Sequence, residues 1–213
     1  LPQSFAILDT QDQLSAIKRL CKQFNIDEER YVPKQLMYFI SGAKEEGDRP
    51  KDIKAHDDET RKKVEIYELY EAQCLREGVV DFGELILRSY EVLRDNPPIR
   101  EHYNRRFRHI LIDEFQDTNK LQYAWIKMFS GHSPIDNCVN SSQNNSKSSV
   151  FAVGDDDQSI YAFRGARVGN MADFVREFNV QHQIKLEENY RSYSNILDSA
   201  NQLISHNSHR LGK

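Results

Sequence analysis

The stretch Ile110-Leu111-Ile112-Asp113-Glu114 decides the fold class of this 213-residue chain. Three consecutive apolar residues are typical of a short strand buried in a parallel sheet, and two carboxylates follow them directly. A helical pattern covers residues 118–129, and a second apolar run, residues 150–153, ends in a glycine and three aspartates. The order strand, helix, strand predicts part of an α/β nucleotide-binding core with a parallel sheet.

Asp113 and Glu114 stand where such a core carries its catalytic carboxylates. In a nucleoside triphosphatase, an Asp at a strand end is coupled to Mg²⁺, and a neighbouring Glu can orient and deprotonate the attacking water. Taken alone, the pair favours an ordinary loop, because Asp-Glu after a strand is common loop composition. The catalytic interpretation therefore depends on the residues that follow.

The chain before residue 108 is typical of a helical region. Five helices are predicted, and their start signals are a capping box at Thr10 and Gln13, Pro33, Asp57 or Asp58, the pair Asp81 and Glu84, and Pro97. Gly47 and Gly78 are expected to end the second and third helices. The change from helical stripes to apolar runs predicts a domain boundary near residue 108.

The composition bounds the class of protein. The chain has 29 basic and 33 acidic residues and a formal charge of −4, so overall charge gives DNA binding no support. Its three cysteines, Cys21, Cys74 and Cys138, lie far apart and predict reduced thiols in a cytoplasmic protein. We expect no membrane partner, because no apolar run approaches the roughly 18 residues of a membrane span. The first residue, Leu1, predicts a start inside a longer reading frame, and no signal peptide is expected.

Two further segments have an unusual composition. Ser and Asn dominate residues 131–149, which predicts a flexible loop that tolerates deletion. Residues 100–109 hold four arginines against one glutamate. For this cluster a solvated helix face is favoured over a DNA contact.

Three longer strings resemble motifs of the UvrD/Rep/PcrA-type superfamily 1 DNA helicases. Residues 113–119, Asp-Glu-Phe-Gln-Asp-Thr-Asn, resemble motif II of that family. Residues 154–166, Gly-Asp-Asp-Asp-Gln-Ser-Ile-Tyr-Ala-Phe-Arg-Gly-Ala, resemble motif III, and residues 186–192, Leu-Glu-Glu-Asn-Tyr-Arg-Ser, resemble motif IV. Their order and spacing also fit, and the amino-terminal helices look like the family's 1B subdomain.

The resemblance implies an α/β, mostly helical fold, with a helical subdomain and a partial RecA-like parallel sheet of the P-loop NTPase type. Residues 1–107 would form the 1B-like subdomain. Residues 108–187 would be the carboxyl-terminal part of the RecA-like ATPase domain 1A, and residues 188–213 would begin the second motor domain.

The resemblance also implies an ATP site that uses Mg²⁺. Asp113 would bind the metal and the nucleotide with it, and Glu114 would be the general base. Gln158 would sense the γ-phosphate and link the state of the nucleotide to the DNA site. Tyr190 would stack on the adenine, and Arg191 would reach the γ-phosphate as an arginine finger in cis, which is also a catalytic role.

Tyr161, Phe163 and Arg164 are the single-stranded DNA contacts that the resemblance implies. Aromatic faces stack on any base, and a guanidinium binds phosphate, so these residue types suit a contact without sequence preference. Without the motif, packing in a core would be the favoured interpretation. Phe163 stands where relatives commonly carry Trp, and Tyr193 stands where they frequently carry Thr.

The function implied for the parent protein is an ATP-dependent DNA helicase that translocates on single strands and unwinds duplex DNA, with 3′-to-5′ polarity, in repair or replication. Repair or replication proteins would be its further partners. The family's phosphate-binding string, G-x-x-x-x-G-K-[ST], does not occur in these residues, so the 213 residues alone are expected to be inactive as an ATPase. Two alternatives stay open: a non-hydrolysing module that binds single-stranded DNA or protein, and a helicase subunit of a recombination nuclease.

Overall fold

The computed structural model describes residues 2–132, 147–162, 165–167 and 169–206. The helices in these ranges are α1 (Thr10–Gln23), α2 (Pro33–Glu46), α3 (Asp58–Glu77), α4 (Phe82–Asp95), α5 (Pro97–Arg106), α6 (Lys120–Ser130), α7 (Gly169–Glu177) and α8 (Ser194–Ile204). The strands are β1 (Ala6–Leu8), β2 (Val79–Asp81), β3 (His109–Ile112) and β4 (Ser149–Ala152). Three single-turn 3₁₀ helices are η1 (Pro50–Asp52), η2 (Phe115–Asp117) and η4 (Asp156–Gln158).

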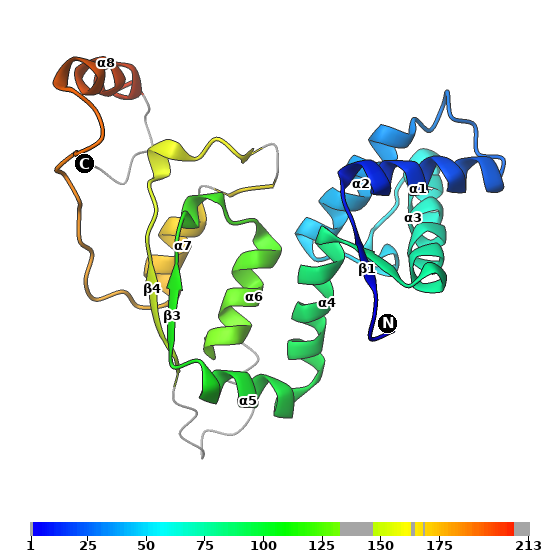
Figure 1. Cartoon of the computed structure of the whole chain (residues 1–213), viewed down its shortest axis with the longest axis horizontal. Coiled ribbons are helices and arrows are strands. Elements are labelled where there is room, and N and C mark those ends of the chain that lie inside the picture. The colour runs from blue at the N-terminus through cyan, green and yellow to red at the C-terminus, as the bar shows by residue number, and fades with distance from the viewer. Residues whose placement is uncertain (1, 133–146, 163–164, 168, 207–213) are drawn as a thin grey trace.

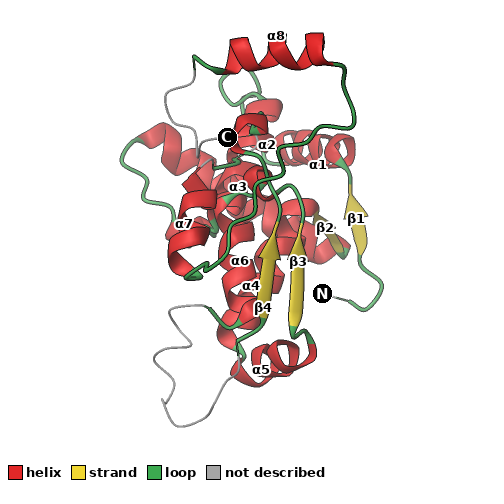
Figure 2. Cartoon of the chain, turned by 90° about the vertical axis from the view of Figure 1, so that its left-hand side faces the viewer, coloured by secondary structure: helices red, strands yellow, loops and turns green. Residues whose placement is uncertain are grey.

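The strands form two separate parallel pairs. β3 pairs with β4, with Ile112 opposite Ala152, and this pairing confirms the predicted α/β fold with a parallel sheet. β1 pairs with β2, with Ala6 opposite Val79. The sequence does not predict the second pair, because its pattern before residue 108 indicates only helices. Figure 2 shows both pairs among the helices.

Most helix boundaries follow the local signals in the sequence. Pro33 and Pro97 occupy the first positions of α2 and α5, and Asp57 and Asp81 cap the starts of α3 and α4. Gly47 and Gly78 end α2 and α3 in the left-handed conformation, with φ values of 91° and 67°. These signals are local, so the helix boundaries that they mark can be predicted without knowledge of tertiary contacts.

The predicted cap of the first helix is wrong by one residue. Asp9, not Thr10, caps α1: its carboxylate accepts hydrogen bonds from the backbone N–H groups of Gln11 at 2.7 Å and Asp12 at 2.8 Å. Asp12 accepts the return bond from the Asp9 N–H at 3.4 Å. The box is therefore Asp9 with Asp12, because the carboxylate one position earlier binds the free amides of the first turn.

The described part of the chain contains two hydrophobic cores. The first lies among α1, α2 and α3 and includes Ile17, Leu20, Leu36, Ile40, Ile66 and Tyr67. The second lies under the β3–β4 pair and joins Phe115, Tyr123, Ile126 and Phe174. α4 packs on α6, and α2 packs on both of them. Contacts therefore cross residue 107, and a domain boundary at that point stays a prediction.

The β3–β4 pair is covered on one face only. Ile112, Val150 and Ala152 pack against the core of α6 and α7. On the opposite face Leu111 is 78% exposed and Phe151 is 56% exposed. The expectation of a strand buried in the sheet is thus wrong for this face, because among the described residues no helix packs over Leu111 and Phe151.

The arginine cluster of residues 100–109 is only partly solvated. Arg100 is buried, whereas Arg105 and Arg106 are exposed.

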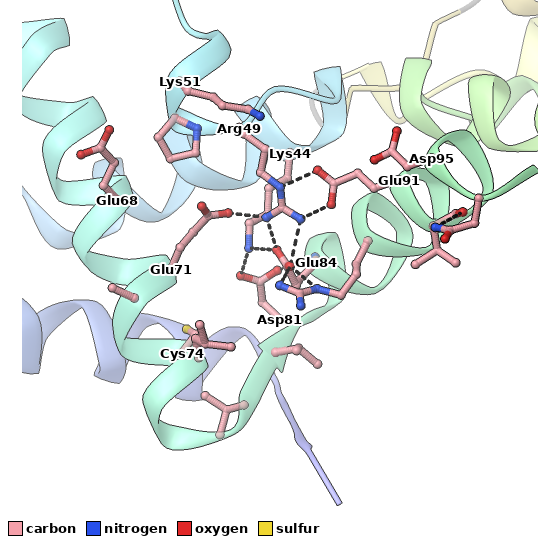
Figure 3. Close-up of a pocket in the computed structure, with 18 residues that line it drawn as sticks. Lys44, Arg49, Lys51, Glu68, Glu71, Cys74, Asp81, Glu84, Glu91 and Asp95 are labelled. Carbon is pink, nitrogen blue, oxygen red and sulfur yellow. Dashed lines mark hydrogen bonds and ion pairs between the residues drawn. The ribbon is translucent and has the colours of Figure 1, made fainter. Parts of the chain in front are cut away.

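A buried charge network joins α2, α3 and α4 (Figure 3). It lines a cleft of about 670 Å³. Lys44 on α2 is 2% exposed, and its Nζ lies 2.8 Å from a carboxylate oxygen of Asp81 and 3.1 Å from one of Glu84. Tyr70 on α3 donates a hydrogen bond of 2.9 Å to Asp81. Four elements, α2, α3, β2 and α4, therefore meet at one buried lysine–carboxylate cluster.

Arg49 extends this network along α4. Its guanidinium donates to Glu84 at 2.8 Å and to Glu91 at 2.6 Å, and it also pairs with Glu71 on α3. Burial by itself raises the pKa of Glu84, but the hydrogen bond from Arg49 and the charge of Lys44 outweigh burial and lower this pKa to about 2. A carboxylate with a lowered pKa stabilises the fold above its unfolded-state pKa, and this contribution is lost as the pH falls toward about 2.

Candidate active site at the carboxyl end of the β3–β4 pair

The two strand ends bring the predicted carboxylates to the edge where parallel sheets bind ligands. Hydrogen bonds continue the pairing past the strands: the Val153 N–H donates to the Ile112 carbonyl at 2.8 Å, and the Phe115 N–H donates to the Val153 carbonyl at 2.9 Å. Asp113 and Glu114 follow β3 at this edge and are both exposed. Their side chains are accessible to a ligand.

Glu114 has an unusual backbone. Its φ of 49° and ψ of 44° are left-handed, which is uncommon for a residue other than glycine. Such a conformation costs on the order of 1–3 kcal/mol and persists only where neighbouring contacts hold it. The Glu114 N–H donates to the Asp113 carboxylate at 3.0 Å, and the Glu114 carboxylate accepts from the Gln116 side chain at 2.7 Å. The strained residue is the predicted base.

The loop after β4 presents a second set of polar groups to the same edge. Asp155 caps η4 by accepting from the Asp157 N–H at 3.2 Å. Gln158 is exposed, and its amide donates to Asp155 at 2.7 Å. The Asp155 N–H donates to the side-chain oxygen of Gln116 at 3.0 Å. The structure thus joins the loops of Glu114 and Gln158 through hydrogen bonds.

Carboxylates at this edge have the donor chemistry that Mg²⁺ prefers. Asp113 offers exposed oxygens after β3. Asp155, Asp156 and Asp157 offer oxygens that lie within 4.8 Å of one another. Hard oxygen ligands of this kind suit Mg²⁺, which is usually bound through one or two carboxylates together with substrate phosphates. The donor set therefore fits the metal expected from the sequence.

The predicted DNA-contact residues lie only partly within the described structure. Tyr161 is half-buried, and its carbonyl accepts from the Ala166 N–H at 3.2 Å. Phe163 and Arg164 lie outside the described residues, as do Cys138 and most of the loop predicted over residues 131–149. The Arg167 N–H donates to the Thr118 carbonyl at 3.1 Å, so Arg167 lies against the loop after β3.

Tyr190 and Arg191 lie on the extended segment before α8. Tyr190 is 87% exposed, and the Arg191 N–H donates to the Asn189 side chain at 2.9 Å. α8 contributes no buried residue, and both views show it at the edge of the molecule (Figures 1 and 2). Within the described residues no hydrogen bond or ion pair joins Tyr190 or Arg191 to the strand-end carboxylates. The structure does not bring this part of the predicted ATP site together.

Sequence reasoning missed Gln116 as a functional candidate. The side chain is 1% exposed and contacts both loops of the site. The available signal was a neutral amide within an acidic string, Asp113 to Asp117, where a donor to a carboxylate is useful. That signal identifies a residue type but not its partner across the sheet.

Comparisons with known proteins agree with the motifs. Residues 1–179 match the family model described as the UvrD/REP helicase N-terminal domain. The chain is 49% identical over its whole length to DNA helicase II of Haemophilus influenzae, covering 27% of that protein. It is 46% identical to DNA helicase II of Escherichia coli and 35% identical to the ATP-dependent DNA helicase PcrA of Leuconostoc citreum, again over the whole chain. It spans 28% and 27% of those two proteins. No helix in the described ranges is long and apolar enough to cross a bilayer.

Proposed function

Because the chain belongs to the UvrD/REP helicase family, we propose that it is the part of an ATP-dependent DNA helicase that activates water for ATP hydrolysis and contacts single-stranded DNA. The observation that carries this proposal is the pair Asp113 and Glu114 at the carboxyl end of β3, joined by hydrogen bonds to the loop of Gln158. We propose division at residues 107 and 187, with residues 188–213 beginning a second motor domain.

The proposed roles follow from position and chemistry. Asp113 binds Mg²⁺, which neutralises charge on the phosphates when it is present. Glu114 accepts a proton from the water that attacks the γ-phosphate. Gln158 contacts the γ-phosphate through its exposed amide. Tyr190 stacks on the adenine and Arg191 binds the γ-phosphate, which requires the segment before α8 to approach the strand ends when ATP binds.

The same proposal extends to the whole protein. We propose translocation on single strands and unwinding of duplex DNA with 3′-to-5′ polarity, in the cytoplasm, during repair or replication. The names of the relatives, DNA helicase II and PcrA, support a helicase more than a nuclease-associated subunit. Polarity and pathway rest on the resemblance of motifs II to IV.

The 213 residues by themselves are expected to hydrolyse no ATP, because they contain no G-x-x-x-x-G-K-[ST] string to hold the phosphates. The full-length gene product is expected to show ATPase activity stimulated by single-stranded DNA. Both preparations can be compared in one coupled ATPase assay with and without a poly-thymidine oligonucleotide. Stimulated turnover by the 213 residues that disappears in Glu114→Gln would overturn the expectation. Weak DNA binding without turnover would support the binding-module alternative for this portion alone.

Loss of one aromatic ring is expected to separate DNA binding from hydrolysis. Phe163→Ala in the full-length gene product should weaken single-strand binding by about 1–3 kcal/mol, the contribution of one stacked base. Basal ATP hydrolysis should stay largely intact, and unwinding should fall more than hydrolysis does. Fluorescence anisotropy titrations with a labelled oligonucleotide, together with ATPase and strand-displacement rates, measure the three effects.

Phe24→Ala is the matched control for this variant, because Phe24 is an exposed ring at the end of α1 and has no proposed DNA role. It is expected to bind DNA normally. If Phe163→Ala bound single strands normally but lost basal hydrolysis, Phe163 would be a core residue that supports the ATP site.

A further inference from the structure

Gln116 connects the two loops of the candidate site through a single buried amide. Its Nε2 donates to Glu114 Oε2 at 2.7 Å, and its Oε1 accepts from the Asp155 N–H at 3.0 Å. Asp155 in turn accepts from the Gln158 amide at 2.7 Å. The hydrogen bonds form a continuous path from Glu114 to Gln158.

The surroundings of Gln116 require a side chain that donates at one end and accepts at the other, as an amide does. One end must donate, because it faces a carboxylate, and the other must accept, because it faces a backbone N–H. A carboxylate lacks the donor unless it is protonated, and an apolar side chain lacks both groups. The two partners therefore also fix which end of the amide carries the nitrogen.

Gly154 provides the space for this amide. A Cβ atom at residue 154 would lie 2.7 Å from Gln116 Oε1, 3.3 Å from the Gln116 backbone nitrogen and 3.3 Å from the Met171 sulfur. Real Cβ atoms do not approach other atoms as closely as 2.7 Å. The glycine two residues after β4 thus allows the amide to bridge the loops.

We propose that Gln116 is a positioning residue, which holds the Glu114 carboxylate in a fixed relation to the loop of Gln158. This inference rests on the proposed function of Glu114 as base. The amide binds one carboxylate oxygen and leaves the other for the attacking water, while Gln116 itself touches neither water nor nucleotide. A fixed carboxylate matters because a misplacement of about 1 Å lowers a reaction rate on the order of 10²-fold.

Gln116→Glu tests the inference in the full-length gene product. The substitution places a second carboxylate next to that of Glu114. At low pH the two carboxylates share one proton, which raises the pKa of the pair. This proton replaces the hydrogen-bond donor that the Gln116 amide provides in the wild-type protein. We expect kcat to fall about 10- to 100-fold near pH 8, with KM for ATP changed less than about twofold, and to recover toward about pH 6. The wild-type protein should show no such loss as the pH rises. The measurement is kcat and KM against pH.

Gln122→Glu is the matched control. Gln122 completes the capping box at the start of α6 with Asn119, and Glu serves equally at this position. The substitution adds the same charge in the same segment, and its kcat is expected to stay unchanged at every pH. A loss in Gln122→Glu equal to that in Gln116→Glu would overturn the inference, because added charge alone would explain it.

Other outcomes separate the inference from the proposed function. If Glu114→Gln abolishes turnover, the role of Glu114 stands. The positioning role is then overturned by either of two results for Gln116→Glu: a wild-type kcat, or a kcat that is lowered equally at all pH values together with a loss of thermal stability. If Glu114→Gln retains turnover, the proposed function itself fails. If Gln116→Glu does not fold, Gln116→Met decides: a lower kcat with unchanged KM and melting temperature supports the inference, and unchanged kcat or a lower melting temperature refutes it.

Discussion

Glu114→Gln is expected to lower ATP turnover by the full-length gene product about 10²- to 10⁴-fold, the contribution of a positioned general base. The amide keeps the size of the side chain but cannot take a proton from water. Affinity for ATP and for single-stranded DNA should persist, because neither contact uses this proton. Steady-state ATPase rates, fluorescent nucleotide titrations and DNA anisotropy measure the three quantities on one preparation.

Glu65→Gln is the control for Glu114→Gln. Glu65 is an exposed residue of α3 that pairs with Lys62 one turn away, and its loss should leave turnover unchanged. If Glu114→Gln retained more than about a tenth of the wild-type rate, the assignment of Glu114 as base would be wrong. The carboxylates of η4 would then be the residues to test next.

Asp81→Ala is expected to lower the free energy of unfolding by about 3–5 kcal/mol, the cost of removing one partner of a buried ion pair. The carboxylate caps α4, accepts from Tyr70 and neutralises Lys44, whose side chain is 3% exposed. Without it, Glu84 is the one close anionic partner that the lysine keeps among the described residues. Urea unfolding of the 213-residue chain, followed by far-ultraviolet circular dichroism, measures the change.

Asp9→Ala is the matched control, because Asp9 is also an N-cap aspartate but is exposed. Removing a cap of this kind costs about 1 kcal/mol. The difference between the two variants isolates the contribution of the buried network. Equal losses would show that Asp81 acts only as a helix cap and that Lys44 finds sufficient compensation in Glu84.

The parts of the fold that the sequence predicted depend on local signals. Pro33, Pro97, Gly47 and Gly78 act through their own backbone preferences, so the helix boundaries that they mark could be placed in advance. β1 and β2 contain three residues each and pair across more than 70 positions, as Ala6 with Val79. No periodic pattern fits into three residues, so this pair could not be recognised without its partner.

The candidate site also contains residues that the local sequence predicts and residues that it does not. Asp113 and Glu114 could be chosen because they follow an apolar run, and a strand end is visible in sequence. Gln116 could not, because its importance lies in a hydrogen bond to Asp155, which is 39 positions further along the chain. The roles of Tyr190 and Arg191 came from family resemblance and stay predictions.

The pairing of β1 with β2 has an evolutionary consequence. The chain leaves the sheet after Leu8 and returns at Val79, opposite Ala6, so the intervening helices begin and end at neighbouring points. A segment with adjacent ends can be lengthened, shortened or exchanged without moving the rest of the chain. Residues 9–78 form such a segment, and they contact the rest of the chain through the packing of α2 and the charges of Lys44 and Arg49. The β1–β2 pair is the junction between this segment and the rest of the chain.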